Sequence, residues 1–300
     1  MKSVFSIDDL ISRETLDAGA SKPARLAVIG HPVAHSASPG MHQPALDTLG
    51  IDARYIRLEI RPGDVATAFA RMRALGFIGC NVTVPHKLEA MAACGEIHPD
   101  ARSLGAVNTV RFDDDGVTRG FNTDGPGFAR AIDDLFSTPL STLRVAVLGA
   151  GGGAGQAIAT TCAMHRVPHL VIVNRSADKL DALMPRLRAH APQSEIAAAT
   201  FDDPRLPGLV SACDLVVNAT SVGLKPGDPP VVPAECLRTG QFVNDTIYQP
   251  AVTPLMELAS SLGCHTANGL PLLLHQGILA FQHWFPGTQP DAPMRAALGL

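Results

Sequence analysis

Short apolar runs alternate with segments of helical spacing along most of this chain. Strands are predicted at 25–30, 55–60 and 79–84 and later around Val145, Val171, Ile196, Leu215 and Phe242, and helices at 42–49, 65–75, 128–136 and 271–284. Strands that alternate with helices through short connections form sheets whose strands are mostly parallel. The pattern therefore predicts an α/β fold.

Two apolar segments, 107–112 and 117–121, interrupt this alternation. Asp113-Asp-Asp-Gly116 separates them, and Asp-Gly between β-rich runs is a strong hairpin signal. We therefore expect an antiparallel element in the first sheet, which makes that sheet mixed.

Breaker residues indicate where the first domain ends. The breaker cluster Asp124-Gly-Pro-Gly127 precedes an amphipathic stretch, 128–136, which is expected to link the two domains. We predict a first domain at 24–125, a second domain at 126–268 and a C-terminal helical segment at 269–300 that packs back across a cleft. Trp284 is expected to anchor the last helix in the core.

A glycine-rich turn opens the α/β pattern of the second domain. The stretch VAVLGAGGGAG at 145–155 follows an apolar β-branched pattern and precedes a helix-forming segment. In a dinucleotide-binding turn, one glycine allows the tight turn, a second allows the pyrophosphate to approach the backbone, and a third small residue lets helix and strand pack closely. These roles fall to Gly149, Gly151 and Ala154, and the backbone amides at the start of the helix would face the anion. The alternative is a plain structural turn from strand to helix.

The next apolar run ends in Asn174-Arg175-Ser176, and Lys179 follows one helical turn later. NAD-binding proteins usually place a carboxylate here, which binds the adenosine 2′-hydroxyl and repels a 2′-phosphate. A guanidinium can instead pair with phosphate through two hydrogen bonds, and Ser176 and Lys179 add a donor and a positive charge. We therefore predict NADP as the cofactor. The alternative is that Arg175 is only a solvated residue at a strand end.

Composition excludes several other classes of function. The 300 residues carry a formal net charge of −4, which argues against nucleic acid or an anionic membrane as the main partner. The six cysteines form no C-x-x-C pair, which favours a reducing cytoplasm. The N-terminal segment has acids where a signal peptide needs an apolar run, so we expect no export. The length suggests two domains. As partners we expect only a small-molecule substrate, and we expect the protein to be a monomer or a homodimer.

Four more segments combine glycine or proline with small polar residues at or just beyond predicted strand ends. Open α/β sheets bind their ligands at such places. The segments are GHPVAHSASPGMH at 30–42, GCNVTVPHK at 79–87, GAVNTV at 105–110 and GFNTDG at 120–125.

Together with the glycine turn, NATSVG at 218–223 and YQPAVTP at 248–254, these segments closely resemble the shikimate dehydrogenase family. The resemblance implies an N-terminal mixed-sheet substrate domain and a Rossmann-like NADP-binding domain around a cleft. It also implies the reversible reduction of 3-dehydroshikimate to shikimate by NADPH, a step of chorismate and aromatic amino acid biosynthesis.

The resemblance further assigns roles to individual residues. Ser36 and Ser38 would bind the substrate carboxylate, with Thr83 nearby. The ring hydroxyls would be held by Lys87, Asn108, Asp124 and Gln276, and Tyr248 is a further substrate contact. The expected cofactor residues are Gly149, Ala150, Gly151, Gly152, Gly153, Asn174, Arg175, Ser176, Lys179, Thr220, Thr246 and Gly269.

Lys87 is the candidate proton donor and acceptor, and Asp124 would orient it. Ketone reduction needs a proton at the carbonyl oxygen as hydride arrives from the nicotinamide. Desolvation lowers the pKa of a lysine, whereas a nearby carboxylate raises it, so the sequence leaves the net shift open. The alternative is that Lys87 and Asp124 form a simple surface ion pair.

The chain departs from the family pattern at several positions. Gln43 stands where the family usually has Asn, a change expected to affect helix capping. Ser176 and Lys179 replace a common Thr and Arg, which could relax the preference for NADP because lysine lacks the bidentate fork. The run 271–274 (PLLL) could reshape the nicotinamide pocket. Competing functions are a quinate or aminoshikimate dehydrogenase that uses NAD, and a non-catalytic dinucleotide-binding regulator.

Other polar residues have simpler interpretations. Asn122 either contributes to the site or satisfies the backbone of a turn, as Asn often does. His31, His35, His42 and His86 lack the spacing and acidic partners of metal ligands, so we expect no metal site.

Overall fold

We describe residues 2–300 of a computed structural model, which forms two compact units. Unit 1 comprises the described residues up to Thr123 together with Leu274–Leu300, and unit 2 is Asp124–Leu273. The boundary between the units therefore also falls inside the long helix α11 (Leu270–Trp284). The domain boundaries expected from the sequence at 125/126 and 268/269 stay predictions.

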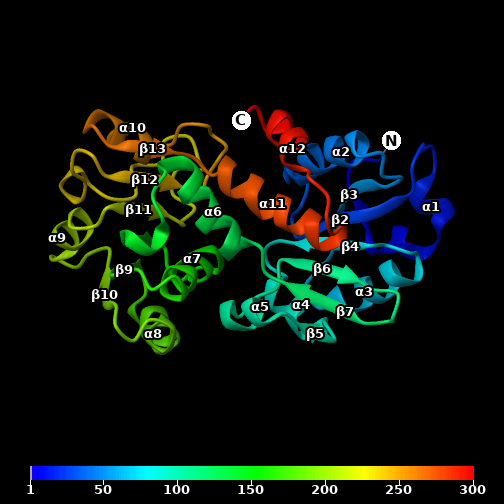
Figure 1. Ribbon diagram of the computed structural model, residues 1–300, viewed down its shortest axis with the longest axis horizontal. Coiled ribbons are helices and arrows are strands. Elements are labelled where there is room, and N and C mark those ends of the chain that lie inside the picture. Colours follow the sequence, from blue (N-terminus) through cyan, green and yellow to red (C-terminus); the bar gives the residue numbers. More distant parts are fainter. Residues whose placement is uncertain (1) are drawn as a thin grey trace. The chain divides into compact units, whose positions relative to one another are not determined.

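Unit 1 is built on a seven-stranded mixed sheet in the order β1-β3-β2-β4-β6-β7-β5 (Figure 1). Its strands are β1 (Phe5–Ser6), β2 (Ala24–Gly30), β3 (Arg54–Glu59), β4 (Gly79–Val82), β5 (Glu96–Ile97), β6 (Thr109–Phe112) and β7 (Thr118–Phe121). Strands β1 to β4 pair in parallel, whereas β6 is antiparallel to both β4 and β7. The predicted hairpin and the mixed sheet are confirmed.

Short helices surround this sheet. They are a 3-10 turn at Ile7–Ile11, α1 (Arg13–Asp17), α2 (Ser38–Thr48), α3 (Val65–Ala74), α4 (Lys87–Ala93), α5 (Pro99–Leu104) and α12 (Asp291–Leu298). The sequence suggested that α11 is the last helix. A further helix, α12, follows it and packs on α2. Helix α2 begins at Ser38, four residues before the predicted start at 42.

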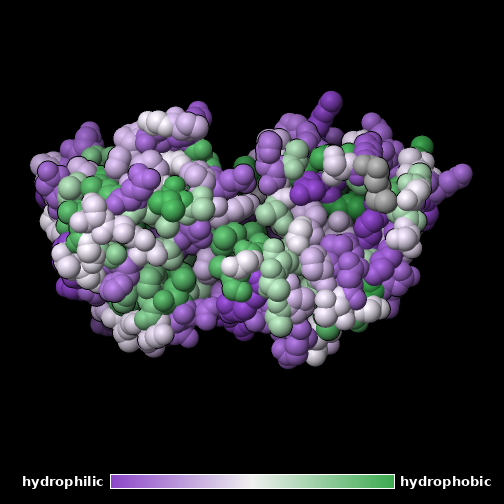
Figure 2. All heavy atoms as spheres, turned by 90° about the horizontal axis from the view of Figure 1, so that it is seen from above, coloured by the Kyte–Doolittle hydropathy of each residue, from purple (hydrophilic) through white to green (hydrophobic). Residues whose placement is uncertain are grey.

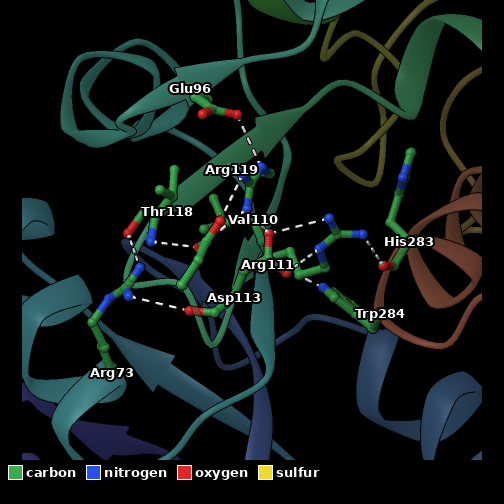
Figure 3. Close-up of polar contacts among 11 residues, drawn as sticks. Arg73, Glu96, Val110, Arg111, Asp113, Thr118, Arg119, His283 and Trp284 are labelled. Carbon is green, nitrogen blue, oxygen red and sulfur yellow. Dashed lines mark hydrogen bonds and ion pairs between the residues drawn. The ribbon is translucent and has the colours of Figure 1, made fainter.

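The end of α11 is joined to the hairpin by an arginine-rich cluster (Figure 3). Asp113 accepts hydrogen bonds from Arg111 and Arg119, and Arg111 Nη1 also donates to the carbonyl oxygen of His283 at 3.0 Å. Trp284, which is buried as predicted, donates from Nε1 to Val110 O at 2.9 Å. Gly79 is required beside this contact because a Cβ there would overlap both Val110 O and Trp284 Nε1.

Unit 2 has a six-stranded, wholly parallel sheet in the order β10-β9-β8-β11-β12-β13. The strands are β8 (Arg144–Leu148), β9 (His169–Asn174), β10 (Glu195–Thr200), β11 (Leu215–Asn218), β12 (Phe242–Asp245) and β13 (His265–Ala267). This order is that of a doubly wound dinucleotide-binding sheet, and it places the reversal of strand order between β8 and β11.

The two faces of this sheet pack into separate cores, because successive strand residues point to opposite sides. Val145 and Val147 belong to one core, and Ala146 and Leu148 to the other. The helices of the unit are α6 (Asp124–Phe136), α7 (Gly153–Met164), α8 (Ala177–His190), α9 (Leu206–Ser211) and α10 (Pro254–Ser261), with 3-10 turns at Leu140–Thr142 and Ala234–Cys236.

Helix α6 corrects the interpretation of its first residues. The cluster Asp124-Gly-Pro-Gly127, expected to be a breaker before the helix, forms the first turn of this helix. Proline is tolerated there because the first N–H groups of a helix have no intrahelical acceptor.

The surface of each unit is mixed in character. Figure 2 shows hydrophilic and hydrophobic residues interspersed over the face in view. Val84 and Leu88 are among the exposed large hydrophobic residues, and both lie within three positions of Lys87. Within residues 2–300, no helix has the length and apolar character needed to cross a membrane.

Candidate functional site

Unit 2 contains a pocket of about 510 Å³ at the carboxyl ends of its strands. Eight of the residues predicted to bind the cofactor line it: Gly149, Gly151, Gly152, Asn174, Arg175, Ser176, Lys179 and Thr220. Phe201, Ala219, Ser221, Val222 and Pro229 to Val231 complete the lining. Ligands of doubly wound sheets bind in this position, outside the carboxyl ends next to the reversal of strand order.

The glycine turn after β8 is compact for identifiable reasons. Gly149 has φ +86°, which favours glycine, and a Cβ there would lie 2.7 Å from Thr220 Cγ2. A Cβ on Gly151 would come within 2.5 Å of the Asn174 amide. Substituting either glycine would therefore push side chains into the pocket wall.

The residue that lets α7 approach the turn is Gly155, and the assignment of that role to Ala154 is wrong. Ala154 is exposed, whereas a Cβ on Gly155 would overlap the carbonyl oxygen of Gly149. Gly152 is the N-cap of α7, and no side chain within residues 2–300 caps that helix. The positive end of the helix dipole thus faces the turn, and no acidic residue lies in the first turn of α7 to neutralise it.

The end of β9 supplies positive charge. Arg175 and Lys179 are exposed side chains of the pocket lining, and Asn174 Nδ2 donates to Ser176 O at 3.1 Å, which stabilises the turn into α8. The described lining contains no Asp or Glu. A carboxylate that would bind a free 2′-hydroxyl and repel a phosphate is therefore missing from this lining.

Four predicted cofactor residues do not line the pocket. Ala150 is buried, and Gly153 is the exposed first residue of α7. Thr246 Oγ1 donates to Asn218 O at 2.9 Å, and a Cβ on Gly269 would overlap Thr246 O. The loops after β12 and β13 therefore approach each other closely, and glycine at 269 is what allows it.

In unit 1, the loop between β2 and α2 positions the two predicted carboxylate ligands. Ser36 Oγ donates to Ser38 Oγ at 3.2 Å, and Ser38 is the buried first residue of α2. Arg57 holds the loop by donating to Ser36 O from Nε at 3.0 Å and from Nη2 at 2.8 Å. The two hydroxyls are adjacent, which suits an anion with two acceptor oxygens.

Thr83 lies against the same loop. Its amide donates to Ile29 O at 2.9 Å, and a Cβ on Gly30 would lie 2.6 Å from Thr83 Cγ2. Gly30 thus allows the end of β2 to approach Thr83.

Asn108 is buried in a hydrogen-bonded network that the sequence did not reveal. Its Oδ1 accepts from the Thr123 amide at 2.7 Å and from Thr109 Oγ1 at 3.1 Å, and its Nδ2 donates to Thr123 Oγ1 at 3.0 Å. An amide group has two N–H donors, so the second can serve a ligand. The network fixes Asn108 as a hydrogen-bond donor toward any bound molecule.

The network continues through two buried residues, Asn81 and Tyr55. Asn81 Nδ2 donates to Thr109 Oγ1 at 3.2 Å, and Tyr55 donates from its hydroxyl to Asn81 Oδ1 at 2.7 Å. Burial raises the pKa of Tyr55 well above its usual value, although a hydrogen bond from Ser38 opposes this shift. Tyr55 therefore remains a neutral donor and links Ser38 to Asn108.

The other predicted substrate residues start or follow regular elements. Lys87 is the half-buried first residue of α4, and Asp124 is the half-buried first residue of α6, directly after Thr123. A carboxylate at a helix N-terminus is stabilised by the helix dipole. Gln276 lies on α11 within unit 1, and Tyr248 lies in the loop after β12 in unit 2; both are half-buried.

Gln43 does not cap α2, contrary to the expectation. It is inside the helix, where its Oε1 accepts from the Tyr55 amide at 2.9 Å and its Nε2 donates to Ala53 O at 3.2 Å. The side chain therefore joins α2 to the start of β3. Asn122 donates to Ala106 O at 2.9 Å, which agrees with the interpretation that it satisfies backbone.

Two of the histidines considered as metal ligands, His42 and His86, are buried in unit 1. His42 is fully buried and stacked on Tyr55 with 4.6 Å between ring centres, and His86 Nε2 contacts Ile60 O at 2.7 Å. Burial lowers the pKa of His42 to about 3. Over residues 2–300, no group of three His, Cys, Asp or Glu side chains is arranged to hold a metal ion.

A model of the shikimate dehydrogenase substrate-binding domain matches residues 28–110, and a model of the saccharopine dehydrogenase NADP-binding domain matches residues 145–270. The shikimate dehydrogenase (NADP(+)) of Methanopyrus kandleri is 38% identical over 276 residues, which cover 91% of this chain and 94% of that protein. This chain belongs to the shikimate dehydrogenase family.

Two solved structures of shikimate dehydrogenase relatives agree with this assignment. The shikimate 5-dehydrogenase of Thermus thermophilus, in complex with NADP(H) and shikimate, matches with a TM-score of 0.80 and 34% identity over 92% of this chain and 98% of that one. The quinate dehydrogenase of Corynebacterium glutamicum, in complex with NAD, matches with a TM-score of 0.81 and 28% identity over the same shares of the two chains. The predicted family and the two-domain α/β fold class are confirmed.

Proposed function

We propose that this protein is an NADP-dependent shikimate dehydrogenase, which reversibly reduces 3-dehydroshikimate to shikimate in chorismate and aromatic amino acid biosynthesis. The observation that carries the proposal is the 38% identity to an NADP(+) shikimate dehydrogenase over nearly the whole chain. We place the reaction in the cytoplasm and expect a monomer or homodimer. The six cysteines, all free in the structure, support a reducing compartment.

The pocket in unit 2 fits NADP. Its glycine turn leaves backbone amides at the start of α7 facing the pocket, and Arg175 and Lys179 offer two cations for a 2′-phosphate. The bound nicotinamide would supply the hydride. In this assignment Thr220, Thr246 and Gly269 contact the nicotinamide end, while Ala150 and Gly153 shape the turn.

The predicted substrate residues fit a polyhydroxylated carboxylate. Ser36 and Ser38 would donate to the carboxylate, with Thr83 beside them, and the second N–H of Asn108 would donate to a ring hydroxyl. Gln276 and Tyr248 would complete the substrate contacts. Lys87 would donate a proton to the ketone oxygen during reduction and accept it during oxidation, and Asp124 would hold the lysine in place.

The test is nicotinamide absorbance on purified protein with shikimate or quinate, each offered with NADP or NAD. We expect fast reduction of NADP with shikimate. Activity confined to quinate or to NAD would show a related dehydrogenase instead, and no activity in any mixture would favour a non-catalytic dinucleotide-binding protein.

The first prediction concerns Lys87→Ala. Because the proton donor is removed, kcat should fall by about 100- to 10,000-fold, with a smaller change in KM. Lys22→Ala is the matched control, because Lys22 pairs with Asp47 on the surface of the same unit. A Lys87→Ala protein with nearly normal kcat would remove this lysine from the mechanism.

A further inference from the structure

We propose that Asp245 is a positioning residue for the nicotinamide half of the cofactor pocket, and that its negative charge favours the oxidised cofactor. The inference rests on the proposed function. Asp245 is the last residue of β12 and its side chain is fully buried in unit 2. Asp245 is not among the site residues that the sequence predicts.

The Asp245 carboxyl accepts three hydrogen bonds from described residues. Oδ2 accepts from Asn218 Nδ2 at 3.0 Å and from Thr253 Oγ1 at 2.7 Å, and Oδ1 accepts from the Ile247 amide at 3.0 Å. A group that only accepts is arranged as a carboxylate rather than a carboxylic acid. Burial raises the pKa of Asp245, while these three hydrogen bonds oppose that rise.

Asn218 carries the effect of Asp245 to the wall of the pocket. Its Oδ1 accepts from the Thr220 amide at 3.0 Å and from Thr220 Oγ1 at 2.7 Å. Thr220 lines the pocket opposite Gly149, whose added Cβ would meet the threonine methyl. The carboxylate therefore orients Asn218, and Asn218 in turn fixes Thr220.

The same carboxylate anchors the loop that follows β12 at both of its ends. Ile247 lies immediately before Tyr248, and Thr253 is the N-cap of α10, where it accepts from the Met256 amide. Tyr248 is thus held on a loop fixed through Asp245 on either side of it. Removing the carboxylate would free the pocket wall and this loop together.

The topology of the sheet places Asp245 in the nicotinamide half. Arg175 follows β9, so the adenosine side of a bound dinucleotide lies over β8 to β10. The turn after β8 takes the pyrophosphate, and the remaining nucleotide must lie over β11 to β13. The oxidised nicotinamide ring carries a positive charge and the reduced ring does not, so a buried negative charge in this half attracts the oxidised form more strongly.

The test uses Asp245→Asn, which keeps the shape of the side chain and removes its charge. Dissociation constants are measured by calorimetry for NADP+, NADPH and 2′-phospho-ADP-ribose, which lacks the nicotinamide. We expect the NADP+ constant to rise about three- to tenfold more than the NADPH constant. The constant for 2′-phospho-ADP-ribose should stay unchanged.

Asp214→Asn is the matched control. Asp214 directly precedes β11, at the amino end of that strand, whereas Asp245 lies at the carboxyl end of β12; Asp214 pairs there with Arg144. That variant should leave all three constants unchanged. Equal weakening of the three ligands by Asp245→Asn, or an unchanged ratio of the NADP+ and NADPH constants, would overturn the proposal.

A second variant keeps the test decisive where Asp245→Asn does not fold. Asn218→Ala retains the charge but removes the acceptor of Thr220, so both dinucleotides should weaken by a similar factor while 2′-phospho-ADP-ribose does not. Uniform weakening of all three ligands contradicts the positioning role. These binding constants are independent of turnover, so an inactive wild type would refute the proposed function without deciding the role of Asp245.

Discussion

Arg175 shows how one side chain can decide the choice of cofactor. It is exposed on the pocket wall at the end of β9, with Lys179 on the first turn of α8 beside it. No Asp or Glu of the described chain lines the pocket around these two cations. Their positive charge is therefore available to a phosphate group.

The second prediction is that Arg175→Ala lowers kcat/KM for NADP by about 10- to 100-fold, because charge-assisted hydrogen bonds to the 2′-phosphate are lost. The value for NAD should change little, since NAD has no phosphate at that position. Steady-state kinetics with both cofactors measure the difference. Arg188→Ala, on the exposed surface of α8, is the control. Equal losses with NADP and NAD would show that Arg175 does not contact the phosphate.

At the scale of the element, the first turn of α7 packs directly against the glycine turn that precedes it. Gly155 lies so near Gly149 that any side chain would overlap a backbone oxygen. Backbone cannot move aside as a flexible side chain can, so the helix itself would have to shift.

The third prediction is that Gly155→Ala weakens NADP binding at least tenfold and lowers the free energy of unfolding of unit 2 by about 1–3 kcal/mol through overpacking. Calorimetric titration and urea unfolding measure the two effects. Gly208→Ala is the matched control, because Gly208 lies inside helix α9 of the same unit with open space around it and does not line the pocket. That variant should bind NADP normally and gain up to about 1 kcal/mol from better helix propensity. A Gly155→Ala protein that behaves like Gly208→Ala would contradict the packing argument.

The sequence predicted the long central elements well and the ends of helices poorly. Strands such as β8 and β9 were recognised because each contains a continuous apolar run. The starts of α2 and α6 were misplaced because proline and glycine lie in their first turns, where the helix tolerates them. The two- and three-residue strands β1, β5 and β13 were missed, since their pairing depends on distant partners.

The candidate site divides in a similar way. Gly149, Arg175 and Ser36 lie in local motifs that carry their own signal, so the sequence alone offers them as candidates. Asp245 and Tyr55 gained their significance only in the structure, because their polar partners come from other strands and loops. A single sequence does not show which buried polar groups will pair.

At the scale of the whole molecule, the buried His42 and the half-buried His283 make unit 1 sensitive to acid. His42 has no hydrogen-bond partner for either ring nitrogen among the described residues, and burial lowers its pKa from 6.5 to about 3. Burial likewise lowers the pKa of His283 to about 4. The unfolded chain binds protons at these positions below about pH 6.5, and the folded chain does not. Stability should therefore decrease as the pH falls from that value toward the folded-state pKa values.

The last prediction isolates the share of His42. In His42→Phe the ring can still stack on Tyr55 but binds no proton. Between pH 7.5 and pH 5, the free energy of unfolding of this variant should therefore fall by about 2 kcal/mol less than that of the wild type. Trp284, the single tryptophan of the chain, is buried with its ring centre 5.4 Å from that of His42, so its fluorescence in urea reports the unfolding of unit 1.

His35→Ala, an exposed position in the same unit, is the control. Overpacking by the larger ring could lower stability at every pH, but only loss of the titrating group changes its slope. A variant whose stability falls with acid as steeply as the wild type would show that His42 already accepts its proton in the folded protein.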